Sequence, residues 1–377
     1  MTESRTLTDG QRWLLQRLDH GAHPLDGIEP EPARATIERL DGLEPEPWAA
    51  AWGALSERFE QQALAAGDDR QAARKAWMDA YRASFIGRYP IPNHPAKQEQ
   101  YERAKRLFMT ATGLDNPAVE VVELPFADGD RLQYAERLRF YVARPAESSR
   151  RVEGRLPVVM AWAGIDTWKE EMHERLGALL RKLGFAVLLI DMPGVGESPV
   201  YAGRNAERQW TPIFDWLAAS DDLDPSRVGA VGGSFGGYWA MKLAYTHRER
   251  LRCAVNWGGG VHITFTREWQ ERSRNASSYL MDLMAARARI FGGSTFEDYV
   301  AGCPGLSLLD QGLLDQPSAP LLLCNGRDDV QNSIDDIYLS LDHGDPKAAR
   351  VFPGGHMGEG PVVPTIVEWV SRQLSSG

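Results

Sequence analysis

Apolar residues recur at three- and four-residue steps through the first part of the chain, the spacing of one face of an α-helix. The clearest sets are Trp48, Trp52, Leu55 and Phe59, then Trp77, Tyr81, Ser84 and Phe85, then Tyr101, Ala104 and Phe108. Proline-rich stretches, GIEPEP and RYPIPNHP, separate these segments. Residues 1–115 are therefore predicted to form a helical domain.

The pattern changes near residue 118. The stretches VEVVELPF and LRFYVARP predict two strands at a sheet edge, and a polar turn over residues 146–155 follows them. Short apolar runs then alternate with amphipathic segments. The runs are LPVVMAWAG, GFAVLLIDMPG, RVGAVGGS, CAVNWGGG, APLLLCNG and ARVFPGG, and helices are predicted over 169–183, 205–219, 236–248, 334–342 and 361–374. This alternation predicts an α/β domain over 116–377, with a mostly parallel sheet covered by helices on both faces.

Residues 262–315 interrupt the alternation with helical stretches and no clear strand. Ligands bind beyond the carboxyl ends of the strands in open α/β sheets, where a connection after a strand begins. The segment is therefore predicted to be a helical insertion near the active site.

Composition narrows the class of partner. The chain has 377 residues, of which 43% are hydrophobic and 25% charged, enough for one large domain and a smaller one. Its formal net charge is −10 and it has no dense Lys/Arg stripe, which argues against nucleic acid and favours a small-molecule partner. It contains neither a signal-type segment nor a run of about 18 apolar residues, so we expect a cytoplasmic protein with no membrane partner.

The three cysteines, Cys253, Cys303 and Cys324, are odd in number and far apart, without a CxxC pair. They indicate neither a disulfide framework nor a zinc site. The stretch DMPGVGESP carries Gly194 and Gly196 in a G-x-G arrangement, which suggests a dinucleotide site, but the third glycine of that fingerprint is missing. We therefore predict no cofactor and no metal.

The strongest chemical signal is GGSFG at residues 232–236, which matches G-x-S-x-G between a predicted strand and a predicted helix. Such a turn strains the serine backbone, exposes its hydroxyl at the top of the sheet, and needs glycine at the crowded flanking positions. Ser234 is therefore the predicted nucleophile. The alternative is a glycine-rich turn whose serine has no chemical role.

A serine nucleophile needs a base that a carboxylate orients. Both follow downstream at strand ends, in NGRDD with Asp328 and Asp329 and in GGHMG with His356. Asp329, three residues after Gly326, is the predicted acid, Asp328 is the fallback, and either can instead cap a turn. His356 is the predicted base, with a solvated histidine in a glycine loop as the alternative.

An oxyanion hole requires two backbone N–H groups. Phe235 supplies one by position. The other is predicted from AWAGIDTWKEE, where Gly164 allows the turn and Ile165 directs its amide into the site.

The motifs GSFGG, NGRDD and GGHMG resemble those of the α/β-hydrolase superfamily, whose chain order is Ser, Asp, His. With a helical N-terminal domain before it, AGIDTWKEE resembles a narrower branch. That branch includes 2,6-dihydroxypseudooxynicotine hydrolase, fungal hydrolases that shorten polyketides, and fermentation-respiration switch proteins. The resemblance implies a triad of Ser234, Asp329 and His356, with the helical domain as a cap.

In the C–C hydrolase of this branch an acidic residue of the first loop assists the chemistry, and Asp166 falls at about that place, although the family residue is glutamate. The alternative is that Asp166 caps the helix predicted over 169–183. Trp162, Trp168 and Trp257 lie near predicted strand ends and are candidates for contact with an aromatic substrate, whereas most other tryptophans are expected in the core.

The sequence thus predicts a serine hydrolase that cleaves a carbonyl substrate, foremost a carboxylic ester with aromatic or apolar parts, through an acyl-enzyme. Cleavage of a C–C bond in a β-diketone, aryl ketone or polyketide-type substrate is the alternative. Acyl transfer, and a non-catalytic interaction protein on the same fold, are two further alternatives. The oligomeric state, a homodimer included, stays open.

Overall fold

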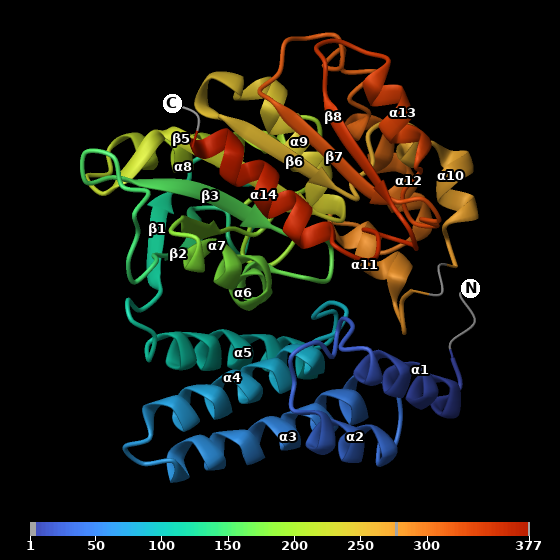
Figure 1. Cartoon of the computed structure of the whole chain (residues 1–377). Coiled ribbons are helices and arrows are strands. Elements are labelled where there is room, and N and C mark those ends of the chain that lie inside the picture. The colour runs from blue at the N-terminus through green and yellow to red at the C-terminus, as the bar shows by residue number, and fades with distance from the viewer. Residues whose placement is uncertain (1–4, 276–277, 376–377) are drawn as a thin grey trace. The chain divides into compact units, whose positions relative to one another are not determined.

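The computed structural model describes residues 5–275 and 278–375 and divides the chain into two compact units (Figure 1). The helical unit comprises residues 5–119 and 278–283. The sheet unit comprises the other described residues. No helix among the described residues combines the length and the apolar character needed to cross a membrane.

The helical unit contains five helices before the first strand. They are α1 (Leu7–Asp19), α2 (Pro30–Glu38), α3 (Pro45–Ala65), α4 (Arg70–Gly87) and α5 (Pro95–Thr112). Pro30, Pro45 and Pro95 open three of them, because proline lacks the N–H that the first turn leaves unpaired. The proline-rich stretches of the sequence therefore mark helix starts.

The predicted apolar faces of these helices cover one another. Trp48 and Trp52 pack with ring centroids 5.6 Å apart, and Tyr81 meets Phe108 edge to face at 5.4 Å. The indole N–H of Trp48 also donates to the carbonyl of Ile86 at 2.9 Å, so this buried polar group is satisfied. The helical unit consequently has a core of its own.

Residues 278–283 return to the helical unit from the long connection between two strands of the sheet unit. Arg17 donates to the carbonyl of Ser278 at 3.3 Å, and Tyr279 lies against Tyr89 with centroids 6.1 Å apart. The fully buried Lys97 has its Nζ 3.4 Å from Asp282 Oδ2. The helical unit therefore includes a segment, residues 278–283, that follows the last of its five helices by more than a hundred residues.

The sheet unit is built on eight strands in the order β1-β2-β4-β3-β5-β6-β7-β8. Their bounds are β1 (Glu120–Pro125), β2 (Arg137–Ala143), β3 (Leu156–Trp162), β4 (Ala186–Leu189), β5 (Leu223–Gly233), β6 (Cys253–Trp257), β7 (Leu321–Gly326) and β8 (Ala348–Phe352). The pairs of β1 with β2 and of β2 with β4 are antiparallel, and the others are parallel. The predicted mostly parallel sheet, with two strands at one edge, is confirmed.

The connections carry the helices of this unit, and in Figure 1 α14 crosses the near face of the sheet while α9 lies behind the strands. The α-helices are α6 (Lys169–Met172), α7 (Ala178–Lys182), α8 (Thr211–Ala218), α9 (Phe235–Thr246), α10 (Arg267–Arg272), α11 (Leu283–Arg289), α12 (Phe296–Gly302), α13 (Asp335–Leu341) and α14 (Val362–Ser375). The helix predicted over 169–183 is interrupted by a π-helical turn, His173–Gly177. No strand lies between β6 and β7 within the described residues, as predicted.

One buried carboxylate anchors the connection after β6. Asp336, in the first turn of α13, accepts the backbone N–H groups of Val261, His262, Ile263 and Thr264 at 2.7–3.1 Å. Asp336 is 1% exposed, so water does not compete with the carboxylate for these N–H groups. This interaction fixes the path of the chain beyond the carboxyl end of β6.

We expect Asp336→Asn to lower the free energy of unfolding by about 3 kcal/mol. The side-chain NH₂ of asparagine would face backbone N–H groups that now donate to a carboxylate oxygen, so these groups would lose their acceptor. Urea denaturation measures the loss. Asp335→Asn is the matched control, since it removes the same charge from the neighbouring, exposed position and should change stability by less than about 0.5 kcal/mol. Equal losses in the two variants would contradict the anchoring role of Asp336.

Candidate active site

Ser234 lies between the last residue of β5 and the first residue of α9, with φ 54° and ψ −131°. A serine rarely adopts this backbone conformation, which costs on the order of 1–3 kcal/mol and therefore needs strong local support. Its own N–H donates to the carbonyl of Trp257 in the neighbouring β6 at 2.8 Å. Helix α9 begins directly after Ser234, and the N-terminal end of a helix carries a partial positive charge.

The glycines around Ser234 leave no room for side chains. A Cβ at Gly232 would lie 2.0 Å from the carbonyl oxygen of Gly236, and a Cβ at Gly236 would lie 2.2 Å from that of Ala163. A Cβ at Gly237 would lie 2.3 Å from Asn256 Oδ1. Backbone atoms cause two of these clashes, so the strand, turn and helix pack this closely only with glycine.

The structure brings three of the predicted residues together. Ser234 Oγ lies 2.7 Å from His356 Nε2, and His356 Nδ1 lies 2.8 Å from Asp329 Oδ2. Asp329 follows β7 and is 7% exposed, whereas the side chain of Asp328 is exposed. Of the two aspartates, Asp329 contacts His356, and the hydroxyl, imidazole and carboxylate form one chain of hydrogen bonds.

Both oxygens of Asp329 are satisfied. Oδ2 accepts from His356 and from Asn325 Nδ2, the latter at 2.8 Å, while Oδ1 accepts the N–H groups of Gln331 and Asn332 at 2.7 and 3.2 Å. Burial alone raises the pKa of Asp329, but His356 and the hydrogen bonds outweigh burial, and the pKa is lowered from its ordinary value of 3.8. The carboxylate therefore stays charged beside the imidazole.

The first loop, between β3 and α6, lies directly against the serine. A Cβ at Gly164 would stand 2.9 Å from Ser234 Oγ and 3.6 Å from the backbone nitrogen of Phe235. The next residue, Ile165, is fixed through its carbonyl, which accepts the indole N–H of Trp168 at 2.9 Å. Trp168 is buried and thus braces the turn that precedes α6.

Asp166 is 9% exposed and follows Ile165. The N–H of Lys169, the first residue of α6, donates to Asp191 Oδ1 at 3.0 Å, and whether Asp166 caps the helix stays a prediction. The N-cap is Trp168, whose N–H donates to the carboxylate of Glu171 at 3.2 Å. Asp191, which follows β4, thus accepts one backbone N–H at the start of this helix.

A buried ionic cluster holds the end of the first loop to the sheet. Lys169 is fully buried, with Nζ 2.6 Å from Asp191, 2.8 Å from Glu197 and 3.3 Å from Glu170. Burial raises the pKa of Glu170, Lys169 opposes the rise, and Asp191 and Glu197 add to it. Tyr141 donates to Glu170 at 3.1 Å, so the cluster joins the loop to β2 and β4.

Two of the predicted aromatic candidates serve the architecture of the site. Trp162 is fully buried, its ring lies 5.0 Å from that of Trp210, and its N–H donates to the carbonyl of Gly236 at 2.8 Å. Trp257, at the end of β6, donates its indole N–H to the carbonyl of Met357 at 2.7 Å. Each indole thus supports a backbone turn beside Ser234 or His356.

Packing explains the G-x-G of the loop after β4. A Cβ at Gly194 would lie 2.4 Å from the carbonyl oxygen of Ile290, and one at Gly196 would lie 2.2 Å from Asp191 Oδ2. The buried guanidinium of Arg131 donates to three carbonyls of this loop, among them that of Val195 at 2.9 Å. Close approach within the protein therefore accounts for these glycines.

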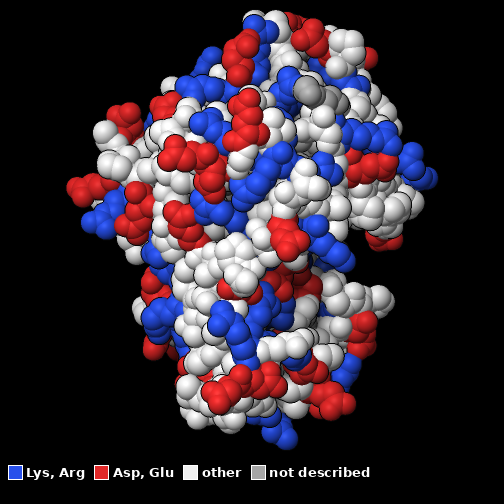
Figure 2. Space-filling view, turned by 60° about the vertical axis from the view of Figure 1, so that its left-hand side comes forward, with Lys and Arg blue, Asp and Glu red and all other residues white. Residues whose placement is uncertain are grey.

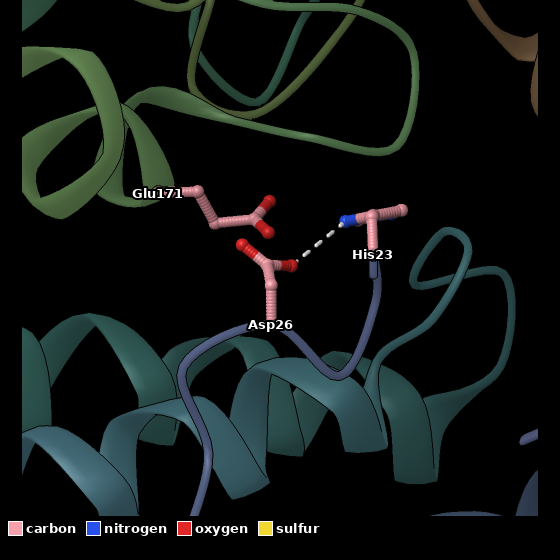
Figure 3. Close-up of side chains that lie close together, drawn as sticks. All are labelled: His23, Asp26 and Glu171. Carbon is pink, nitrogen blue, oxygen red and sulfur yellow. Dashed lines mark ion pairs between the residues drawn. The ribbon is translucent and has the colours of Figure 1, made fainter. Parts of the chain in front are cut away.

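Outside this site, the loop between α1 and α2 holds a His–Asp pair, with His23 Nδ1 3.8 Å from Asp26 Oδ1 (Figure 3). Glu171, drawn in the same figure, belongs to the sheet unit, where it accepts the N–H of Trp168. Figure 2 shows acidic and basic side chains interspersed over one face, without a continuous stripe of either sign. That no metal is needed stays a prediction.

Sequence reasoning missed Asn325 and Lys169. Asn325 immediately precedes Gly326 at the end of β7, where an asparagine is typical of a turn, and only its distances to Asp329 and to the His356 loop reveal a different environment. Lys169 is part of the quoted stretch TWKEE, which a helix start explains equally well. No signal in the sequence separates these uses.

Comparison with known proteins identifies the family of the chain. The family described as "Esterase FrsA-like" matches residues 37–344. Hydrolase ORFZ of Pyricularia oryzae is 30% identical over 222 residues, 54% of this chain and 50% of the relative. Esterase FrsA of Photorhabdus laumondii is 25% identical over 294 residues, 75% of this chain and 66% of the relative. The chain thus spans about half to two thirds of the length of these curated relatives.

Solved structures show the same fold at low identity. The 2,6-dihydroxy-pseudo-oxynicotine hydrolase superimposes with a TM-score of 0.70 at 21% identity, covering 96% of this chain and 95% of that one. The structure described as AbyA5 wild type gives a TM-score of 0.72 at 21% identity, with 98% and 99% covered. The chain has the α/β-hydrolase fold and belongs to the FrsA-like esterase family.

Proposed function

We propose that this protein is a hydrolase that cleaves carboxylic esters through an acyl-enzyme on Ser234. The observation that carries the proposal is the unbroken chain of hydrogen bonds from Asp329 through His356 to Ser234 Oγ. A serine hydroxyl is a weak nucleophile at neutral pH, and an adjacent base that a carboxylate orients is what activates it.

His356 Nε2 takes the proton of Ser234 Oγ as that oxygen attacks the ester carbonyl. Asp329 holds the ring through Nδ1 and stabilises the imidazolium that forms. The backbone N–H groups of Phe235 and Ile165 stabilise the negative oxygen of the tetrahedral intermediate. Its collapse releases the alcohol, which takes the proton from His356. A water molecule then attacks the acyl group by the same route and frees Ser234.

The substrate class we propose is a small ester with aromatic or apolar parts. Several relatives are fungal hydrolases, among them a 20-hydroxy-prefusarin hydrolase of Gibberella moniliformis that is 29% identical over 260 residues. The helical domain of residues 1–115 acts in this proposal as a cap that selects substrates. Trp48, Trp52, Tyr81 and Phe108 pack in the core of this domain, so selection would depend on other side chains.

Hydrolysis of a C–C bond is the second candidate. It is favoured by the burial of Asp166 directly after Ile165 in the loop that lies against Ser234. An ester carries a competent leaving group, whereas C–C cleavage releases a carbanion or enolate that must be protonated. A buried carboxyl group held in its protonated form can supply that proton.

We expect Ser234→Ala to lower kcat for an aryl ester by about four orders of magnitude or more, with the fold intact. A fluorophosphonate should label the wild-type protein at Ser234 and leave the variant unlabelled. Peptide mapping by mass spectrometry identifies the labelled residue. Label on another serine, or undiminished turnover in the variant, would exclude Ser234 as the nucleophile.

The two neighbouring aspartates give a matched comparison of the acid. Asp329→Asn should lower kcat by about three orders of magnitude or more, because the amide no longer stabilises the imidazolium. Asp328→Asn removes an exposed carboxylate and should stay within about twofold of the wild type. Steady-state kinetics with one ester tests both, and a mild Asp329→Asn beside a severe Asp328→Asn would reverse the assignment.

Asp166→Asn separates the two candidate reactions. If the protein is a C–C hydrolase, the variant should lose about tenfold or more on a β-diketone, the effect expected for removal of a general acid, and stay near wild type on an aryl ester. Parallel assays on both substrates give the answer, with the melting temperature as control for folding. Wild-type turnover of the ester alone, unchanged in the variant, identifies an esterase and excludes the second candidate.

A further inference from the structure

The hydrogen bonds of the candidate triad are one half of a closed ring. The other half runs from the Ser234 N–H to the Trp257 carbonyl at 2.8 Å, and from Trp257 Nε1 to the Met357 carbonyl at 2.7 Å. It continues from the Met357 N–H to Asn325 Oδ1 at 3.0 Å and from Asn325 Nδ2 to Asp329 Oδ2 at 2.8 Å. The ring thus joins the ends of β5, β6, β7 and β8.

Met357 is the strained member of this ring. It follows His356 and has φ 68°, a conformation that costs a residue with a side chain on the order of 1–3 kcal/mol. Trp257 holds its carbonyl and Asn325 holds its N–H, so both polar groups of the residue are fixed from outside the loop. The position of the His356 backbone therefore depends on these two side chains.

Asn325 fixes two parts of the site at once. Its Oδ1 accepts the N–H groups of Gly326 and Met357, and its Nδ2 donates to the same Asp329 oxygen that accepts from His356. The acceptor role of Oδ1 assigns the orientation of the amide, because a flipped amide would oppose N–H groups. The side chain is 3% exposed, so water does not replace it.

Trp257 is hydrogen-bonded both to Ser234 and to Met357, the residue after His356. Its carbonyl accepts from the nucleophile residue and its indole donates to the residue after the base. Close packing supports the bridge, since a Cβ at Gly258, which has φ 79°, would lie 3.0 Å from Met357 Cγ. The separation between Ser234 and His356 is therefore set by one residue of β6.

We propose that Asn325 and Trp257 are positioning residues, which hold the Met357 peptide so that the His356 ring bridges Ser234 Oγ and Asp329 Oδ2. The proposal rests on the proposed function of the triad. Neither residue is assigned contact with the reacting atoms. Both affect the rate of the chemical step by placing His356. A displacement of a reacting group by about 1 Å can lower that rate on the order of a hundredfold.

The test uses Asn325→Ala and Trp257→Phe in the full chain, which remove the side-chain bonds and keep the Trp257 carbonyl. Each variant should lower kcat for an aryl ester by about tenfold or more while KM stays within about twofold, because the hydrogen bonds removed are internal to the protein and Phe keeps an aromatic ring at position 257. The double variant should have a kcat only a little below that of the less active single variant, since both side chains act on the same peptide. Trp48→Phe is the matched control, because it removes an indole–carbonyl bond of 2.9 Å inside the helical unit.

A readout that needs no turnover separates this proposal from the proposed function. The proton between His356 Nδ1 and Asp329 Oδ2 gives a far-downfield proton NMR signal, which should be present in the wild type and lost or shifted in Asn325→Ala. If the wild type neither turns over esters nor labels at Ser234, the proposed function fails and the NMR signal alone decides on the ring. The positioning role is overturned if Asn325→Ala retains the signal, if kcat of both variants stays within about twofold of the wild type, and if their melting temperatures fall no further than that of Trp48→Phe.

Discussion

The left-handed backbone of Ser234 is the constraint on which the rest of this site depends. A serine with φ 54° stands at the junction of β5 and α9, where its Oγ lies 2.7 Å from His356 Nε2 and the helix N-terminus follows directly. The conformation persists because Gly232 and Gly236 allow the strand and the helix to approach, and because β6 accepts the serine N–H. Packing and hydrogen bonding in the sheet thus stabilise a geometry that the serine alone would avoid.

Two buried carboxylates near this turn have opposite electrostatic environments. The pKa of Asp329 is lowered because His356 and several N–H donors outweigh its burial, so it stays charged. The pKa of Glu170 is raised because burial and two neighbouring carboxylates outweigh Lys169. The first suits a partner of an imidazolium, and the second suits a structural anchor. The environment, more than the residue type, decides what each acid does.

The sequence predicts the elements well where one local rule is sufficient. Alternating apolar runs predict the parallel sheet, and the motif GGSFG predicts the position of Ser234 between a strand and a helix. The sequence does not predict contacts between residues that are distant in the chain. Asp191 accepts the N–H of Lys169 at the start of α6, and Asn325 is indistinguishable from a turn residue until β8 brings the His356 loop beside it. The return of residues 278–283 to the helical unit also depends on tertiary packing that periodicity cannot report.

The proposed reaction requires Ser234 to form a covalent acyl intermediate. Stopped-flow mixing of the protein with p-nitrophenyl acetate, followed by acid quench and peptide mass spectrometry, detects such an intermediate. We expect a burst of p-nitrophenol close to one equivalent per chain, and an acetyl group on the peptide that carries Ser234. Turnover with neither a burst nor an acetylated Ser234, under conditions where deacylation is slowed, would contradict the proposed reaction.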